Sequence, residues 1–320
     1  GRLRAGWHAR PPGEEAATVS AGSLGDRLYL LDGSSLAFRA FFALPDTITT
    51  ADGFPTNALF GFSQMLLKIV AEYRPANVVV AWDGPEKTFR HEEFEDYKAH
   101  RPEMPDLLSQ QWPRLPGLVG AFGFVNLIRP GYEADDIIAT MVTRALPLDY
   151  RILVVTGDRD SIQLVNDDVT VLYPRKGVSD LTRFTPEQVQ EKYGLTPAQY
   201  PDFAALRGDP SDNLPGIPGV GEKTASKWIR EFGSLENLVD KVDTVRGKVG
   251  ESLRTNLSSV ILNRQLTEMV RDLALPYTPD QLELTGWDRE RIHGLFDDLE
   301  FRVLRDRLFE TLSSAEPEVD

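Results

Sequence analysis

Carboxylates that follow predicted strands are the residues of this 320-residue chain best suited to do chemistry. Asp32 ends the buried run RLYLLD, Asp83 ends NVVVAWD, and Asp158 and Asp160 lie in TGDRD, where YRILVVTGD ends. Because parallel strands present their carboxyl ends at one edge of an open α/β sheet, these side chains are expected to converge there.

The motif YEADD adds Glu133, Asp135 and Asp136 at the start of a helix that follows another strand. Acids in a first helical turn suit the helix dipole, so one alone would be interpreted as a cap. Seven acids at one edge repel each other, and this repulsion raises their pKa values unless cations bind. Mg²⁺ and Mn²⁺ prefer oxygen ligands, and two ions about 4 Å apart can activate water and stabilise a leaving oxygen. The pattern indicates metal-assisted phosphodiester hydrolysis.

Composition narrows the classes of site and partner. Without cysteine the chain has no disulfides, thiol nucleophiles or thiolate zinc sites, and its four histidines lack a metal-ligand spacing. No apolar run of about 20 residues and no secretory signal is present, so we expect a cytoplasmic protein without membrane contact. The net charge of −14 argues at first against a polyanionic partner. Because metals would neutralise part of a clustered acidic site, the placement of the basic residues matters more.

Short hydrophobic strands alternating with helices predict a mostly parallel sheet covered on both faces. We expect helices over 34–43 and 57–73, and strands over 27–32, 77–83, 124–128, 150–158 and 168–174. Segment 110–123 carries prolines and glycines, which predict a broken or kinked helix. Strands are expected to stop at about Gly177, leaving successive helices over 185–312.

The two ends lack such patterns. Residues 1–25 are rich in Arg, Pro, Gly and Ala and are expected to be a disordered or artificial tail. Residues 313–320 are expected to be a linker or tail. A free-standing protein and a domain of a longer polymerase both fit these ends.

Basic and aromatic residues alternate between Asp83 and Asp106. Such a pattern can hold phosphates while it stacks an unpaired base, although a solvated amphipathic helix explains it at least as well. The residues are Lys87, Phe89, Arg90, Phe94, Tyr97, Lys98 and Arg101.

The stretch LPGIPGVGEKTASKWI (214–229) is typical of a glycine hairpin that opens a helix. Backbone N–H groups there, with Lys223 and Lys227, would make a sequence-independent phosphate site. A glycine-rich helix start with surface lysines is an equal alternative. A nucleotide-binding loop is not matched, because Glu222 intervenes and no buried strand precedes it.

Together, LLDGSSLAFRAFF, FRHEEFEDYKAHRP, YEADDIIAT, VVTGDRDSIQLV and RGDPSDNLPGIPGVGEKTA resemble the flap endonuclease or 5′ nuclease family. Within it, they resemble the N-terminal 5′-3′ exonuclease domain of bacterial DNA polymerase I, from about Leu28 to Leu308. The resemblance implies a PIN-like α/β core over 26–178 with a helical gateway at about 84–106. It also implies a helix-hairpin-helix subdomain over 179–312, with the hairpin at 214–229.

The resemblance further implies roles for single residues. The metal-ligand role of Asp209 and Asp212, in GDPSD, rests on the resemblance alone. An ordinary polar turn is the alternative explanation for these two residues. The implied metal ligands are Asp32, Asp83, Glu133, Asp135, Asp136, Asp158, Asp160, Asp209 and Asp212. The implied contacts to the scissile phosphate are Arg90, Lys98 and Arg101, with Tyr97 stacking on the terminal base. The implied contacts to the duplex backbone, with K⁺, are Gly219, Gly221, Lys223, Thr224 and Lys227.

The resulting hypothesis is a 5′-3′ exonuclease and structure-specific 5′ flap endonuclease that uses two or more Mg²⁺ or Mn²⁺ ions. It would act as a monomer on DNA with 5′ flaps, nicks or 5′ ends, in Okazaki fragment processing and repair at the bacterial nucleoid. The partner expected from the resemblance is a polymerase domain in the same parent chain. A PIN-type ribonuclease is the first alternative, but the hairpin and the helical subdomain suit duplex DNA. A non-catalytic DNA-structure-binding module is the second, but it would lack a ligand, and none is missing here.

Overall fold

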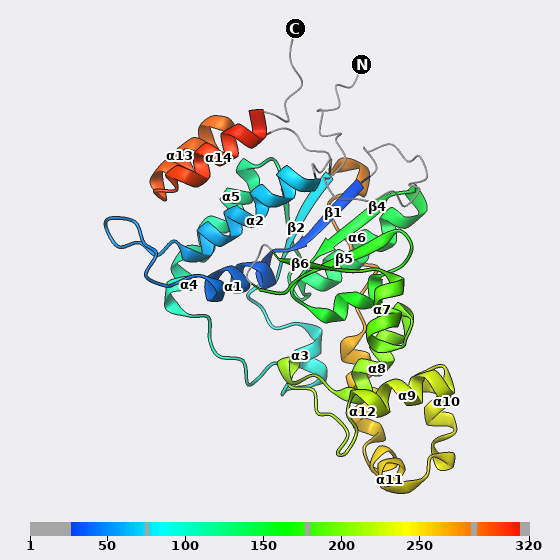
Figure 1. The fold of residues 1–320 in the computed structure, drawn as a ribbon. Coiled ribbons are helices and arrows are strands. Elements are labelled where there is room, and N and C mark those ends of the chain that lie inside the picture. Colours follow the sequence, from blue (N-terminus) through cyan, green and yellow to red (C-terminus); the bar gives the residue numbers. More distant parts are fainter. Residues whose placement is uncertain (1–26, 74–76, 177–179, 283–286, 314–320) are drawn as a thin grey trace.

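The computed structural model describes residues 27–73, 77–176, 180–282 and 287–313 (Figure 1). The tails predicted at 1–25 and beyond 313 lie outside these residues. No helix in these ranges is both long and apolar enough to cross a bilayer.

A six-stranded sheet forms the centre of the first half of the chain. Its order is β3-β2-β1-β4-β5-β6, parallel throughout except for the antiparallel pair β5-β6. The strands are β1 (Arg27–Asp32), β2 (Asn77–Trp82), β3 (Val125–Ile128), β4 (Arg151–Val155), β5 (Val169–Pro174) and β6 (Leu181–Phe184). The five predicted strands are confirmed. The prediction that strands stop at Gly177 is wrong by one, because β6 is a short, partly exposed edge strand without a buried apolar run.

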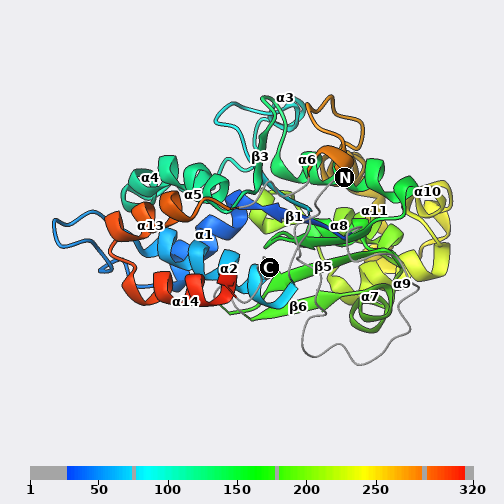
Figure 2. The same ribbon diagram turned by 90° about the horizontal axis from the view of Figure 1, so that it is seen from above.

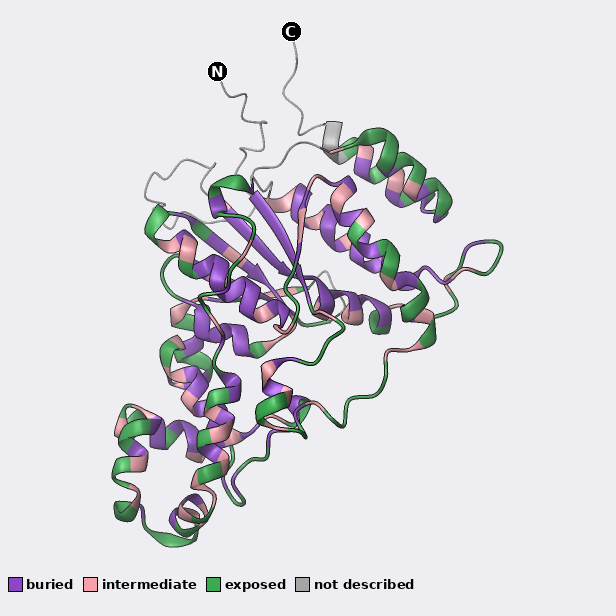
Figure 3. Ribbon diagram, turned by 180° about the vertical axis from the view of Figure 1, so that it is seen from behind, coloured by how far each residue is buried: buried purple, intermediate pink, exposed green. Residues whose placement is uncertain are grey.

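Alternate residues of β1 enter two separate hydrophobic clusters, as the strand period requires. Leu28 and Leu30 pack toward α6 (Ala134–Ala145). Tyr29 and Leu31 pack toward α1 (Gly33–Ala43), α2 (Asn57–Tyr73) and α5 (Leu115–Ala121). The central strands β1 and β2 are buried on both faces (Figure 3), which confirms the predicted covered sheet.

Residues 84–121 contain only short helices. The predicted broken helix is confirmed as α4 (Asp106–Gln111), a 3₁₀ turn at Trp112–Arg114, and α5. The gateway segment, residues 84–106, contains α3 (Phe89–Glu93), followed by turns, and α4 begins only at its last residue, so it is less helical than predicted.

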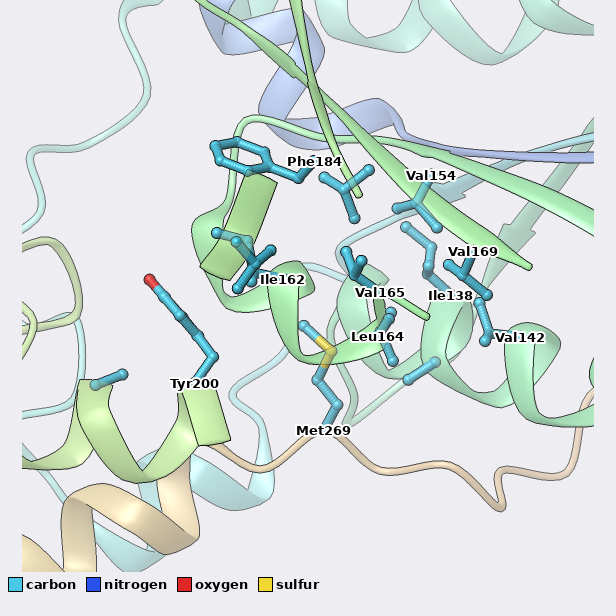
Figure 4. Packing of buried hydrophobic residues seen from close by; sticks show 14 of the residues in the cluster. Ile138, Val142, Val154, Ile162, Leu164, Val165, Val169, Phe184, Tyr200 and Met269 are labelled. Atoms are coloured by element: carbon cyan, nitrogen blue, oxygen red, sulfur yellow. The ribbon is translucent and has the colours of Figure 1, made fainter. Parts of the chain in front are cut away.

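The later helices continue the core of the sheet. They are α7 (Pro186–Tyr193), α8 (Tyr200–Arg207), α9 (Glu222–Phe232), α10 (Leu235–Asp240), α11 (Gly247–Thr255) and α12 (Leu257–Thr267). Figure 4 shows Tyr200 of α8 and Met269 beside Ile162 and Leu164 of the 3₁₀ segment Arg159–Leu164, all in one cluster. The chain then returns, and α13 (Arg289–Asp298) and α14 (Arg302–Ser313) pack with α2 and α5 on the other face of the sheet (Figure 1).

Candidate active site

A pocket of about 620 Å³ opens at the carboxyl edge of the sheet. Six of the nine predicted acids line it: Asp32, Asp83, Glu133, Asp135, Asp158 and Asp209. Their convergence follows from the parallel order of β1, β2 and β4, each of which ends beside the pocket.

Backbone and hydroxyl donors orient the strand-end acids. Asp32 caps α1 by accepting from the N–H of Ser35 at 3.1 Å, and accepts from the hydroxyl of Thr156 at 2.9 Å. Asp83 accepts from the N–H of Ala134 at 2.8 Å, the first residue of α6. Each carboxylate therefore has a fixed direction before any ligand binds.

Asp160, Asp209 and Asp212 form a second group, of which Asp209 lines the pocket. Each offers a carboxylate oxygen, and these oxygens lie within 4.8 Å of one another. Asp209 and Leu214 form an isolated antiparallel bridge that closes the intervening turn. This turn brings the acids of GDPSD to the carboxylates of the sheet edge.

At several of these acids the effect of burial on the pKa outweighs any positive charge nearby, even at Asp212, where Lys98 and Arg101 act in the opposite direction. Burial, together with the charge of Asp83, raises the pKa of Asp32 to about 7. Burial also raises the pKa of Asp212 to about 7, and that of Asp160, where Asp158 adds to the effect. The protein alone stabilises the ionised forms poorly, so cations are the missing component.

Asp135 is the strongest indication of a metal. Burial and the neighbouring charges of Asp158 and Asp32 raise its pKa well above the ordinary value. Its buried Oδ1 accepts no hydrogen bond from any described residue. A buried carboxylate oxygen without a donor is expensive unless a cation meets it, so these residues fit divalent ions.

Arg90 differs from its predicted role. It is 2% exposed, and its Nη1 and Nη2 donate to Asp136 at 2.8 Å, with Nη1 also reaching Glu133 at 2.5 Å. The remaining donors reach the carbonyls of Leu266 and Glu268, so the whole guanidinium is satisfied within the protein. Arg90 therefore positions other residues here and has no donor left for a phosphate.

Asp136, the main partner of Arg90, is also held within the protein. It is fully buried, does not line the pocket, and also accepts from the N–H of Val270 at 2.9 Å. In this structure both of its carboxylate oxygens bond to Arg90, away from the pocket.

Glu133 connects this ion pair to the pocket. Burial alone would raise its pKa, but Lys98 and Arg90 lower it to about 2. The ammonium group of Lys98 is bonded to Glu133 and lies 3.8 Å from Asp212. Lys98 also has a left-handed backbone, with φ of 56°, a strained conformation for a lysine.

Tyr97 also differs from its predicted role. Its side chain is 3% exposed, donates to Glu133 at 3.1 Å, and packs with Leu214 and Leu266. The ring has no open face for a DNA base in this structure. Arg101, by contrast, is half-exposed at the pocket, and its Nη2 lies 2.8 Å from Asp212.

The glycine hairpin lies next to the pocket. Gly219 has a φ of 80°, and Gly221 caps α9, whose Lys223 and Lys227 are exposed and whose Thr224 is half-buried. Glu222 at the start of α9 lines the pocket. A Cβ on Gly208 would lie 2.5 Å from the N atom of Gly216, so only glycine allows these backbones to touch.

Sequence reasoning missed several residues that line the pocket: Ser34, Ser35, Phe38, Arg39, Arg159, Tyr173 and Arg207. Ser34 and Ser35 could have been found, because a helix that starts directly after Asp32 must place its first turn at the sheet edge. Tyr173 lies at the carboxyl end of a predicted strand and carried the same signal. Arg207 is close only because the two halves of the chain pack together.

A mostly parallel sheet, an acidic pocket at its carboxyl edge and an adjoining glycine hairpin define a metal-dependent nuclease. The model of the 5′-3′ exonuclease N-terminal resolvase-like domain matches residues 27–194. The model of the 5′-3′ exonuclease C-terminal SAM fold matches residues 195–290. The chain belongs to the 5′-3′ exonuclease family, which confirms the predicted class of enzyme.

Known proteins are similar over most of the chain. DNA polymerase I of Mycobacterium tuberculosis is 62% identical over 295 residues, which cover 92% of this chain and 33% of that protein. DNA polymerase I of Bacillus subtilis is 42% identical over 291 residues, which cover 91% of this chain and 33% of that protein. The chain thus spans about a third of the length of these relatives.

Solved structures share the fold. The zinc-bound T5 5′-exonuclease has a TM-score of 0.61 at 22% identity, covering 91% of this chain and all of that one. The catalytic core of Rad2 in complex with DNA has a TM-score of 0.60 at 16% identity, with 92% and 94% covered. A T5 flap endonuclease pseudo-enzyme-product complex with DNA and metal ions has a TM-score of 0.64 at 21% identity, with 90% and 99% covered.

Proposed function

We propose that this exonuclease is also a structure-specific 5′ flap endonuclease that hydrolyses DNA with two divalent ions, Mg²⁺ or Mn²⁺. The observation that carries the metal chemistry is the buried, unpartnered Oδ1 of Asp135 among pocket acids with raised pKa values. The bound ions supply an activated water and neutralise charge on the leaving oxygen.

The acids divide into two proposed sets of ligands. Asp135 and Asp158 would hold one ion, with Asp32, Asp83 and Glu133 around them. Asp160, Asp209 and Asp212 would hold the second, because their oxygens already lie within 4.8 Å of one another. Asp136 belongs to neither proposed set, because both of its carboxylate oxygens accept hydrogen bonds from Arg90.

Two cations of the gateway segment face the reacting phosphate in this proposal. Lys98 and Arg101 both line the pocket and both approach Asp212. Their charges would stabilise the negative charge that develops during cleavage. Arg90 and Tyr97 would act indirectly, by fixing Glu133.

The choice of substrate draws on the relatives. One neighbour in fold is named a flap endonuclease and was solved with DNA and metal ions. Gly219, Gly221, Lys223, Thr224 and Lys227 would hold a duplex backbone, with K⁺ at the hairpin carbonyls. A PIN-type ribonuclease would not need this hairpin, and a non-catalytic module would not need unpaired buried acids.

The biological setting is inferred from the relatives alone. Curated relatives are bacterial DNA polymerases about three times as long as the match. We infer a monomeric nuclease in the cytoplasm that works with a polymerase domain of the same polypeptide in Okazaki fragment processing and repair.

A cleavage assay on a double-flap DNA labelled at its 5′ end tests the proposal. Short products released at the flap junction with Mg²⁺ or Mn²⁺, and none with EDTA, are expected, while a single-stranded RNA of matched sequence stays intact. Binding without cleavage would support the non-catalytic module instead, and cleavage of the RNA would support the ribonuclease.

A further inference from the structure

A second hollow, of about 1000 Å³, adjoins the acidic pocket and has the opposite charge. Arg39, Arg159 and Tyr173 line both, so the two are continuous. We call this hollow the basic groove, and its cations are Arg39, Arg159, Arg175, Lys176, Arg183 and Lys192.

The cations of the basic groove outnumber its acids, which are Asp180 and Glu191. In a chain of net charge −14, six cations in one groove are a marked local reversal of sign. Within the described ranges, no carboxylate forms an ion pair with five of them: Arg39, Arg159, Arg175, Lys176 and Lys192. Burial, together with the charges of Arg159 and Arg175, lowers the pKa of Lys192.

The aromatic rings of the basic groove are already occupied by cations. The guanidinium of Arg39 lies 4.9 Å from the ring centre of Tyr173 and donates to its hydroxyl at 2.8 Å. The ammonium of Lys192 lies 5.3 Å from the ring centre of Phe184. These rings hold positive charge in place and leave little room for a stacked base, so the groove suits phosphates.

One hydroxyl in the basic groove is also unsatisfied. Thr182 of β6 lines the groove, and its buried Oγ1 has no hydrogen-bond partner among the described residues. A hydroxyl beside unpaired cations can donate to a phosphate oxygen.

The groove lies away from the gateway. Lys98 and Arg101 line only the acidic pocket, and Figure 2 shows α3 near the β3 edge of the sheet, with β5, β6 and α7 toward the opposite edge. A strand with its scissile phosphate at the acids would therefore meet cations on both sides. We propose that the basic groove binds the phosphate backbone of the DNA substrate beyond the scissile phosphate, on the side away from Lys98 and Arg101; this inference rests on the proposed function.

Charge reversal in the groove tests the proposal. Arg175→Glu/Lys192→Glu is compared with Arg271→Glu/Arg302→Glu, which changes the net charge equally at exposed positions outside the groove. Binding of double-flap DNA is measured in EDTA by fluorescence anisotropy over a range of salt concentrations. We expect Kd to rise at least about tenfold and the salt slope to fall by about two in the groove variant, with little change in the control.

Two further readouts locate the contact and separate it from folding. Replacing single phosphates near the junction by neutral methylphosphonates should weaken wild-type binding at one or more positions, but not binding by the groove variant. Arg175→Gln/Lys192→Gln should show a smaller rise in Kd, and equal thermal midpoints would exclude a folding defect. In single-turnover cleavage, the rate at saturating enzyme should fall less than Kd rises.

Several outcomes overturn the inference. If wild type cleaves flap DNA but the groove variant binds like the control, the groove does not contact the substrate and the proposed function stands. If wild type neither cleaves nor binds flap DNA, the proposed function fails first. If tripolyphosphate binding is lost in the groove variant while DNA binding is unchanged, the groove is a site for free polyphosphate instead.

Discussion

Two parts of the acidic cluster solve the same electrostatic problem differently. Glu133 and Asp136 are neutralised by Arg90 and Lys98, and the pKa of Glu133 falls to about 2 despite its burial. Burial and neighbouring acids instead raise the pKa values of Asp135 and Asp160. The first part is complete as a folded structure, whereas the second is complete only with cations. The nine acids predicted as metal ligands are therefore not equivalent, although nothing in the sequence distinguishes them.

The largest expected effect comes from the cation-requiring part. Asp158→Ala or Asp135→Asn should lower single-turnover cleavage more than about 10³-fold, because a metal ligand is lost. The fold should persist, and the metal-free thermal midpoint should not fall, since each change removes a repelling charge. Full activity after Asp158→Ala would refute the mechanism.

A substitution in the ion-paired part should lower the stability of the fold. Arg90→Met leaves two buried carboxylates without their partner and should lower the free energy of unfolding by about 3–5 kcal/mol. Urea unfolding measures this, with Arg101→Met at the half-exposed neighbour as the control. A loss of DNA cleavage with unchanged stability would show instead that Arg90 acts on the substrate.

Lys98 belongs to both parts and should affect chemistry more than binding. Lys98→Ala should slow single-turnover cleavage about 10²–10³-fold with a small change in Kd for flap DNA. The rate at saturating enzyme, measured beside anisotropy in EDTA, separates the two effects. An equal loss in Kd would make Lys98 a binding residue only.

The dependence of stability on pH should distinguish the two parts without any substitution. Asp32 and Asp212 have folded pKa values of about 7, above their ordinary value of 3.8, so the folded state binds protons more tightly. The metal-free protein should therefore lose stability as pH rises from about 4 to 7, and Mg²⁺ should remove that loss. Glu133, with its pKa lowered to about 2, contributes stability that is lost only as pH falls from 4.5 toward 2.

Thermal midpoints at pH 5.0 and 7.5, with EDTA and with Mg²⁺, test this expectation. The stabilisation by metal should be greater at pH 7.5. Equal stabilisation at both pH values would mean that these carboxylates are ionised without metal.

Tyr97 should give the smallest effect. Tyr97→Phe removes one buried hydrogen bond to Glu133 and should lower the free energy of unfolding by about 1 kcal/mol. DNA affinity should change little, because the ring is buried. A large loss of affinity with retained stability would return Tyr97 to its predicted stacking role.

The parts of the site that follow from local pattern could be predicted. Asp32, Asp83 and Asp158 end buried strands, and the direction of a parallel strand then determines the edge at which each carboxylate lies. Arg90 and Tyr97 could not be assigned in this way. The partners of Arg90 include the carbonyl of Leu266 at the end of α12, 176 residues away along the chain, and no spacing rule indicates it. β6 escaped detection because four half-polar residues carry too little periodicity.

The gateway segment is joined to the turn that carries Asp209 and Asp212. The N–H of Lys98 donates to the carbonyl of Asp212 at 3.0 Å, and the side-chain amide of Asn213 donates to the carbonyl of Asp96 at 2.8 Å. A 5′ end that displaces this segment would also move Asp212. Ordering of the segment and occupancy of the metal site are then thermodynamically linked, so each should favour the other to the same degree. Metal binding would therefore hold the gateway segment in place, and any ligand that displaces the segment would weaken the metal site by the same factor.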